Sequence, residues 1–565
     1  MPPAGDQGPR YGRHVLIAAL GCMAVVLAVN LWVHDVPWGL EHDGLFLVDT
    51  DHADWEARQR PVGYVLLLRA AALLFGSAFR AGHVLAALFT AGFVWSAYRL
   101  SWRLFRREDA ALFSAAALLV FPRFLFSALL ANHDAAFAFC GAMALAELFP
   151  DADPARPPRP VRLGLWLAAA YLVKVLGLFL FIGALALLLF ERRWRPRRAL
   201  LWRVLAAFVL PILLVKLLGT LGSDGGGGGL LLAGFHSAFN LVTILLQLPP
   251  EWVDQAGPGL VLVTIVFRAA AAALEWLAEL PILFTPLLPV AALVVAFDRR
   301  QPERAVRVRR MLVLLAIFVL CLVFTAWRGD EQARYFLPFA PLLLGALFVA
   351  VTDAVTDPGP RPRLRRALGA LVLVLALTGL AWKAAPPFAR DWRYYDWQSQ
   401  GDRRLLTRAE SAAAVDRLHA EFGEGTLFAT NNPAFGLEDP HLIHYDWYFE
   451  DRSIPSNDQS QKGQGFYRAD LTTFLCRVPA TAFLYDSTDR IIRLHRTDDP
   501  SREAAQSWLL QPAAKVGPVV LYRVNRGACD KALTPPGKPV EPQGPPPSSV
   551  APPLSPLDQS APAPN

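Results

Sequence analysis

The chain contains a succession of apolar runs, most of them long enough to cross a lipid bilayer, and this feature restricts the fold more than any other. A hydrocarbon core of about 30 Å needs roughly 20 apolar residues in helical form. The runs are 14–33, 81–104, 109–127, 131–149, 162–175, 176–190, 199–219, 230–248, 258–280, 281–297, 310–327, 335–352 and 367–384. The sequence therefore predicts a polytopic α-helical membrane protein with about 11 to 13 spans.

Composition excludes an ordinary soluble globular protein. Charged residues make up only 18% of the chain and hydrophobic residues 54%, whereas soluble proteins carry about a quarter charged residues. The first run, 14–33, has no small-residue cleavage site and is interpreted as a retained anchor. A shorter run at 62–76 is too short for a full span and predicts an interfacial or re-entrant helix. Residues 162–190 form either two helices or one long tilted helix.

Arginine placement predicts the orientation in the membrane, because short basic loops stay in the cytoplasm. We therefore assign these arginines to topology and not to nucleic-acid binding. Residues 1–13 become a cytoplasmic tail, and the segments 34–80, 220–229 and 328–334 lie outside, as does the chain after 385. The protein is expected in the inner (plasma) membrane. The clusters are Arg99/Arg103/Arg106/Arg107, Arg192/Arg193/Arg195/Arg197/Arg198, Arg299/Arg300/Arg304/Arg307/Arg309/Arg310 and Arg361/Arg363/Arg365/Arg366.

The region after the last run is more polar and predicts a small extracytoplasmic α/β domain at 386–530, after the membrane domain at 14–385. Its expected elements are a helix at Leu405–Phe422 and strands at Thr426–Ala429, Ala482–Tyr485 and Val519–Val524. The proline- and serine-rich end, 531–565, is predicted to be disordered.

Two cysteines, Cys476 and Cys529, lie in this C-terminal region. An exported domain would allow them to form a disulfide, although spacing in the sequence does not show whether they are close enough to pair.

An acidic segment follows the first run and is the first candidate site. The predicted external loop 34–61 contains Asp43, Asp49 and Asp51. A carboxylate at a partly dry membrane boundary can act as a general base, and carboxylates can also bind a divalent cation. A solvated acidic loop is the alternative interpretation.

Two further candidates interrupt apolar runs. His133-Asp134 opens one run, where Asp134 either caps the helix or contributes to a site on the outer side. Lys174 interrupts nearly thirty apolar residues; a buried cation there indicates an anionic partner or an aqueous cavity, unless the lysine snorkels at a hairpin tip.

Arg334-Tyr335 follows a charged outer loop. The forked donors of the arginine suit a phosphate, and the alternative is a membrane anchor.

These motifs, in this order, resemble the GT-C superfamily of membrane glycosyltransferases, in the branch of the protein mannosyltransferases and the aminoarabinose transferase of lipid A. The pattern is Asp43-Gly44, then Arg60-Pro61-Val62-Gly63-Tyr64 before Phe75-Gly76, and Asp134-Ala135-Ala136-Phe137. It continues with Leu172-Val173-Lys174-Val175-Leu176-Gly177 and Arg334-Tyr335-Phe336-Leu337-Pro338-Phe339-Ala340-Pro341. The family has Asp-Glu where this sequence has Asp43-Gly44. Asp49 and Asp51 therefore remain alternative candidates, after Asp43, for the catalytic aspartate.

The resemblance implies a hexosyl- or pentosyl-type transferase that moves a sugar from a polyprenyl-phosphate donor to a lipid, glycan or protein hydroxyl outside the cytoplasm. Asp43 would be the catalytic acid–base residue, and Lys174, Arg334 and Tyr335 would bind the donor phosphate. Asp134, His133, Arg60 and Tyr64 would position substrate. No cofactor is required, and a divalent cation is compatible with the site.

A transporter or flippase of lipid-linked glycans is the alternative function. It would be expected to show two similar halves, and the sequence shows no such repeat. A third alternative, a non-catalytic scaffold, would not explain why the charged residue Lys174 interrupts an apolar run.

Overall fold

The computed structural model describes residues 10–29, 63–119, 133–149, 157–191, 197–221, 287–325, 332–356, 408–444, 474–487 and 508–532, apart from single positions within them, and a few isolated residues between 259 and 406. The first acidic loop and the chain beyond residue 532 lie outside these ranges.

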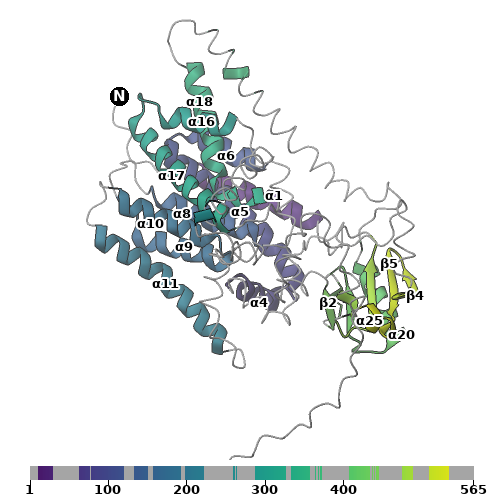
Figure 1. The fold of residues 1–565 in the computed structure, drawn as a ribbon. Coiled ribbons are helices and arrows are strands. Elements are labelled where there is room, and N and C mark those ends of the chain that lie inside the picture. The colour runs from purple at the N-terminus through teal and green to yellow at the C-terminus, as the bar shows by residue number, and fades with distance from the viewer. Residues whose placement is uncertain are drawn as a thin grey trace, which may run out of the picture.

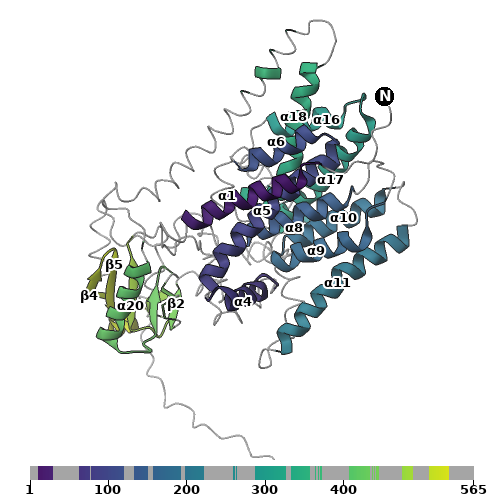
Figure 2. The ribbon, with the colours of Figure 1, turned by 180° about the vertical axis from the view of Figure 1, so that it is seen from behind.

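The helical part packs long apolar helices around a common core of leucine, alanine and phenylalanine (Figure 1). Helix α1 lies along α5, as the view from behind shows (Figure 2), and α8 packs between α5 and α9. The helices are α1 (Gly12–Val29), α4 (Gly63–Phe75), α5 (Ala78–Phe105), α6 (Glu108–Leu119), α8 (Asp134–Glu147), α9 (Pro160–Val173), α10 (Gly177–Phe190), α11 (Arg197–Leu221), α16 (Leu287–Ala296), α17 (Pro302–Thr325), the 3₁₀ helix η4 (Gln332–Phe339) and α18 (Ala340–Thr356).

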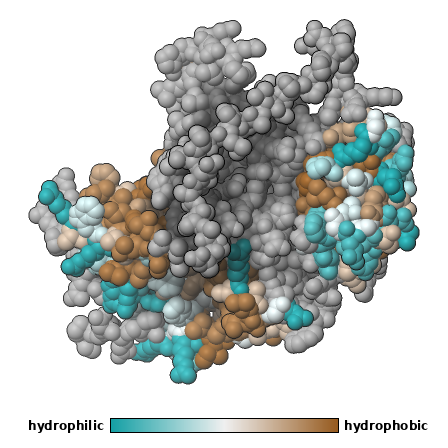
Figure 3. Space-filling model, turned by 90° about the horizontal axis from the view of Figure 1, so that it is seen from below, coloured by the Kyte–Doolittle hydropathy of each residue, from teal (hydrophilic) through white to brown (hydrophobic). Residues whose placement is uncertain are grey.

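Within the described residues, three helices are long and apolar enough to cross a membrane, at Arg80–Phe105, Arg198–Val215 and Tyr335–Thr356. Outward-facing hydrophobic side chains such as Trp202 and Leu210 on α11 lie exposed, and hydrophobic areas appear beside hydrophilic ones in the view from below (Figure 3). Such a surface suits a lipid environment. The remaining predicted spans lie partly or wholly outside the described residues, so their number stays a prediction.

Ion pairs gather at one end of the bundle, which we call the arginine-rich end. There the first turns of α17 contact the ends of α5, α10, α16 and α18, so α17 runs antiparallel to these four helices, and the end of α8 contacts the end of α5. Arg304 Nη2 lies 2.6 Å from both Asp298 and Asp353. Further contacts join Arg107 to Asp353, Arg103 to Glu147, Arg310 to Glu191 and Arg307 Nε to the Leu104 carbonyl.

This arrangement brings arginines from separate predicted cytoplasmic loops to the same side of the bundle. Helix α8 runs about 20 Å from Glu147, at the arginine-rich end, to Asp134 at the opposite end, at 1.5 Å per residue. We call that opposite end the site end.

Helices α9 and α10 are separate and meet in a tight turn at the site end, so the single long helix considered from the sequence is wrong. Lys174 adopts an extended backbone as the C-cap of α9, and its carbonyl accepts a 2.8 Å hydrogen bond from the Gly177 N–H. A Cβ on Gly177 would collide with the backbone of Ala170 and Tyr171. Glycine is therefore what allows α10 to start this close to the end of α9.

Other boundaries differ modestly from the apolar runs. Helix α17 begins at Pro302, eight residues before the run predicted at 310, because its charged first turns bind acidic partners instead of entering lipid. The run at 335–352 begins as a 3₁₀ helix, η4, which contains Pro338. Proline lacks the N–H that an α-helix needs there.

The C-terminal part forms a five-stranded sheet in the order β2-β1-β3-β5-β4. Its strands are β1 (Phe428–Thr430), β2 (Leu442–His444), β3 (Ala482–Asp486), β4 (Leu510–Val516) and β5 (Val519–Val524), with helices α20 (Arg408–Phe422) and α25 (Arg526–Ala532). Strand β1 pairs in parallel with β2 and β3, whereas β5 pairs antiparallel with β3 and β4. The predicted helix and three strands correspond to α20, β1, β3 and β5; the domain limits stay a prediction.

Alternating residues of the strands enter two hydrophobic cores. Phe428 and Leu484 pack with Leu418 of α20 on one face, and Phe483 and Tyr485 pack with other apolar residues on the opposite face. Edge strand β4 carries a register irregularity between Pro512 and Ala514, and the other edge strand, β2, has three residues.

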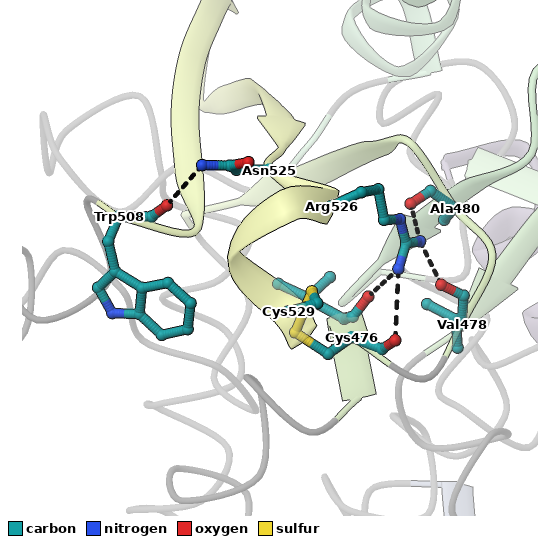
Figure 4. The surroundings of a disulfide bond; sticks show 8 residues. Cys476, Val478, Ala480, Trp508, Asn525, Arg526 and Cys529 are labelled. Carbon is teal, nitrogen blue, oxygen red and sulfur yellow. Dashed lines mark hydrogen bonds between the residues drawn. A yellow bond between two sulfur atoms is a disulfide. The ribbon is translucent and has the colours of Figure 1, made fainter. Parts of the chain in front are cut away.

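Cys476 and Cys529 form a disulfide with a Cα–Cα distance of 5.1 Å. Arg526, at the start of α25, donates beside it to the carbonyls of Leu475, Val478 and Ala480 (Figure 4). The bond links residues 53 positions apart, and a cross-link of this span stabilises by about 4 kcal/mol.

Replacing Gly177 by alanine should destabilise the protein by several kcal/mol, because backbone atoms must shift to admit the methyl group. The matched control is Gly21→Ala in α1, where no heavy atom lies within 4 Å of the added Cβ. Thermal unfolding of detergent-purified protein, followed by the exposure of buried Cys140 to a thiol-reactive dye, measures both. Equal transition temperatures for the two variants would contradict the packing described.

The disulfide predicts that Cys476 and Cys529 resist alkylation in denatured, non-reduced membranes and react after reduction. Cys22 is a free cysteine and serves as the positive control. Mass spectrometry of the alkylated peptides reads the result, and modification of both cysteines before reduction would show that the pair does not form.

Candidate functional site

The site end of the bundle contains a buried lysine–aspartate pair. Lys174 Nζ donates to Asp134 Oδ1, and the two residues are 8% and 1% exposed. Burying either charged side chain by itself would cost several kcal/mol of free energy. Each charge is stable inside the protein because the opposite charge lies beside it. The structure thus gives Lys174 an anionic partner inside the protein, and it excludes the snorkelling alternative.

The local sequence explains how these two charges meet. Asp134 is the first residue of α8, after His133 at the N-cap, and His133 makes no side-chain capping bond. Asp134 is therefore used for an ion pair between helices instead of the capping role considered from the sequence. Lys174 ends α9, and the turn to α10 directs its side chain into the bundle beside α8.

Tyr335 lies over the same lysine. Lys174 Nζ is 4.2 Å from the centroid of the Tyr335 ring, a cation–π contact that strengthens when the cation is desolvated. Helix η4 holds this tyrosine against α8, where Pro338 comes so close that a Cβ on Gly141 would lie 2.9 Å from its Cγ. Lys174 therefore has a carboxylate and an aromatic face as neighbours.

Helix α4 completes the described surroundings. The Tyr64 ring lies 6.1 Å from the His133 ring, centroid to centroid, and Tyr64 is 1% exposed. A Cβ on Gly63 would lie 2.6 Å from Leu172 Cβ, so α4 starts directly against the end of α9. The structure thus brings Asp134, His133, Lys174, Tyr335 and Tyr64 together from four distant parts of the sequence.

Helix ends of both signs meet at the site end, because α9 ends there with a negative partial charge while α8 and α10 begin there. The N-termini of α8 and α10 both lie here, and a helix N-terminus carries a positive partial charge. Lys174 adds a full positive charge, and Asp134 offsets it. A phosphate bound here would therefore need another cation besides Lys174.

The other predicted site residues fall outside the described part of the chain. Asp43, Asp49, Asp51 and Arg60 lie in the range 30–62, and the structure does not describe the side chain of Arg334. The backbone at Arg334 belongs to η4 and directly precedes Tyr335. Their roles stay predictions.

Gly63 and Gly141 were not predicted from the sequence to be packing positions that support the site. A glycine inside an apolar run is the signal that could have found them, since it often marks a close approach between helices.

A second group of ionisable residues lies near the C-terminal sheet. Asp439 accepts from the rings of His419 at 2.6 Å and His441 at 2.8 Å. Burial alone would raise the pKa of Asp439, but hydrogen bonds from the His441 N–H and both histidine rings outweigh it, and the pKa lies below its ordinary value. These contacts join α20 to the segment before β2. Among the described residues, no group of three or more His, Cys, Asp or Glu side chains is placed to hold a metal ion.

Comparison with known proteins agrees with the motifs. Residues 59–218 match the sequence model of the family described as dolichyl-phosphate-mannose-protein mannosyltransferase. That segment includes Tyr64, His133, Asp134 and Lys174. The predicted resemblance to the GT-C membrane glycosyltransferases is confirmed. No match was found among curated proteins.

The comparison with solved structures found matches that include an oligosaccharyltransferase and ArnT. The Archaeoglobus fulgidus oligosaccharyltransferase, in complex with zinc and sulfate, matches with a TM-score of 0.49 and 16% identity over 84% of this chain and 68% of that chain. ArnT from Cupriavidus metallidurans, bound to undecaprenyl phosphate, matches with a TM-score of 0.46 and 16% identity over 91% of this chain and 98% of that chain.

Replacing Asp134 by asparagine should cost about 3–5 kcal/mol of stability, because it leaves the buried Lys174 ammonium without its counter-charge. The double variant Asp134→Asn/Lys174→Met should recover most of that loss. Asp353→Asn is the matched control: its side chain is 40% exposed, and Arg304 keeps Asp298, so the effect should be about 1 kcal/mol or less. Equal losses in the Asp134 and Asp353 single variants, by the same unfolding assay, would argue against a buried pair.

Proposed function

We propose that the protein transfers a hexose or pentose from a polyprenyl-phosphate donor to an acceptor hydroxyl on the extracytoplasmic face of the membrane. The observation that carries this proposal is the buried Lys174–Asp134 pair at the site end, within the segment that matches a mannosyltransferase family. ArnT was solved with undecaprenyl phosphate, and a donor of this chemistry suits a site that combines a cation with helix N-termini.

The positions of the arginines support the proposed orientation of the bundle in the membrane. Arg103, Arg107 and Arg304 meet at one end of the bundle, and short arginine-rich loops stay in the cytoplasm. The site end then faces outward. Helix α18 runs toward the arginine-rich end, so the predicted span 367–384 returns the chain to the site side. The Cys476–Cys529 disulfide suits an oxidising compartment there.

In the proposed reaction, the acceptor oxygen attacks the anomeric carbon while the bond from that carbon to the phosphate oxygen breaks. The polyprenyl phosphate leaves with the electron pair, and the acceptor proton passes to the carboxylate of Asp43, or of Asp49 or Asp51 in its place. Positive groups are needed where charge develops on the departing phosphate.

Lys174 is the described group that suits this task. Asp134 and Tyr335 hold the ammonium in place, and an ammonium has three donors. Because Asp134 offsets its charge, we assign the second cation to Arg334, next to Tyr335 in η4. His133, Tyr64 and Arg60 are proposed to position the sugar or the acceptor, and Asp134 to order the site. No nucleotide is required, since the phospho-sugar bond supplies the energy; a divalent cation at the acidic loop remains part of the proposal.

The test uses purified full-length protein with radiolabelled polyprenyl-phosphate sugars and a panel of lipid, glycan and peptide acceptors. Wild type should release polyprenyl phosphate and label an acceptor. Asp43→Asn should reduce transfer at least about 100-fold, the scale of a lost general base, with normal unfolding behaviour. Asp49→Asn and Asp51→Asn are matched controls in the same loop.

Normal transfer by the Asp43 variant together with loss in an Asp49 or Asp51 variant would move the base to that residue. Movement of intact donor across vesicles without any sugar release would favour the flippase alternative.

A further inference from the structure

Positive charge is in surplus where α5, α8 and α9 meet at the arginine-rich end. Helix α8 ends there at Glu147, whose side chain is 2% exposed. Arg103 of α5 lies with Nη1 3.2 Å from Glu147 Oε1 and also donates to the Ala146 carbonyl. Arg99, one turn earlier on α5, lies with Nη2 3.6 Å from the same carboxylate oxygen. Arg103 therefore balances the charge of Glu147, and Arg99 adds a further positive charge.

Helix α9 brings two more arginines to this place. Arg159 is the N-cap of α9 and Arg162 lies in its first turn, and both are exposed. Their positive charges repel those of Arg99 and Arg103. In the part of the chain that the structure describes, the side chains of Arg159 and Arg162 make no hydrogen bond or ion pair. Four arginines from two helices thus lie around the one carboxylate of Glu147.

The packing of the helices independently places these arginines in one region. Phe139 of α8 lies between the other two helices: a Cβ on Gly92 of α5 would be 3.0 Å from its ring, and the Trp166 ring of α9 meets it edge-on at 5.3 Å. Arg99 comes about two helical turns after Gly92, and Arg162 comes about one turn before Trp166. Each arginine therefore lies on the same side of its helix as that contact. Because α5 ends and α9 begins at the arginine-rich end, both steps along the helices lead to it.

The surroundings of these arginines favour a lipid headgroup over a soluble anion. On α9 the apolar side chains of Val161 and Leu165 are 52% and 47% exposed, directly beside Arg162. On α5 the guanidinium carbon of Arg99 lies 4.7 Å from the centroid of the Trp95 ring. Cations beside outward-facing apolar side chains match a phospholipid, in which a charged phosphate adjoins acyl chains, and basic sites between membrane helices bind such headgroups.

We propose that Arg99, Arg159 and Arg162 bind the phosphate of an anionic phospholipid at the arginine-rich end. Their guanidinium groups present several N–H donors to phosphate oxygens and reach the phosphate from both sides of α8. Arg103 stays with Glu147, so the lipid does not compete with the buried ion pair. The bound lipid joins the end of α5 to the start of α9. It is distinct from the sugar donor of the proposed function, because the lysine–aspartate pair lies at the opposite end of the bundle.

The experiment is native mass spectrometry of the full-length protein released from mixed phosphatidylglycerol and phosphatidylcholine nanodiscs. The double variant Arg159→Gln/Arg162→Gln should lower the ratio of retained phosphatidylglycerol to phosphatidylcholine at least about fivefold, the scale of one arginine at an anionic lipid surface. Arg99→Gln, on the other side of α8, should lower it by a similar factor. Excess inorganic phosphate at constant ionic strength should leave the wild-type ratio unchanged.

The matched control is Arg198→Gln/Arg203→Gln, which removes two exposed arginines of α11 and the same amount of charge. Its ratio should stay within about twofold of wild type, because the proposed site does not include α11. Unfolding temperatures close to that of wild type show that the variants are folded.

Three outcomes overturn the proposal. They are an unchanged ratio in the double variant of α9 or in Arg99→Gln, an equal fall in the α11 control, and loss of the lipid to inorganic phosphate. The measurement uses no sugar donor, so its failure leaves the proposed transfer reaction untouched, and loss of transfer activity leaves the lipid site untouched.

Discussion

A lysine ammonium is stable inside an apolar helical bundle only where a negative charge meets it, and the organisation of the site end follows from that requirement. The Lys174–Asp134 pair holds the end of α9 beside the start of α8, on the same side of the bundle. Tyr335 then brings η4, and with it the start of α18, to the same point. The contacts of one lysine therefore join the end of α9 to the start of α8 and to η4.

The two ends of the bundle use charge differently. At the arginine-rich end, groups such as Arg304 bridge two carboxylates from different helices, so the positive loops predicted as topology signals also hold helices together. At the site end Lys174 and Asp134 are about as buried as Arg103 and Glu147 at the arginine-rich end, and the N-termini of α8 and α10 lie beside them. Several arginine–carboxylate contacts therefore join helices at the arginine-rich end, whereas the ion pair described at the site end is Lys174–Asp134.

Much of the helical pattern could be predicted from the sequence, because a helix that crosses a bilayer needs a long run of apolar residues. The pairing of Lys174 with Asp134 could not, because 40 residues separate them and nothing in local periodicity encodes which charges meet. The sequence left open whether residues 162–190 form two helices or one, because the break between α9 and α10 depends on Gly177 packing against the backbone of Ala170 and Tyr171. In the C-terminal part, β4 and β2 were missed: β4 contains Pro512 and an irregular register, and β2 is three residues long.

Those two missed strands have a consequence for how the C-terminal sheet meets other chains. Among the described residues they are the outermost strands of the sheet, and strand edges left unpaired invite a second chain to add on. Pro512 offers no N–H, the register slip twists β4 away from a flat partner, and β2 is too short to template a neighbour. Edges of this kind disfavour the addition of a strand from a second copy of the chain.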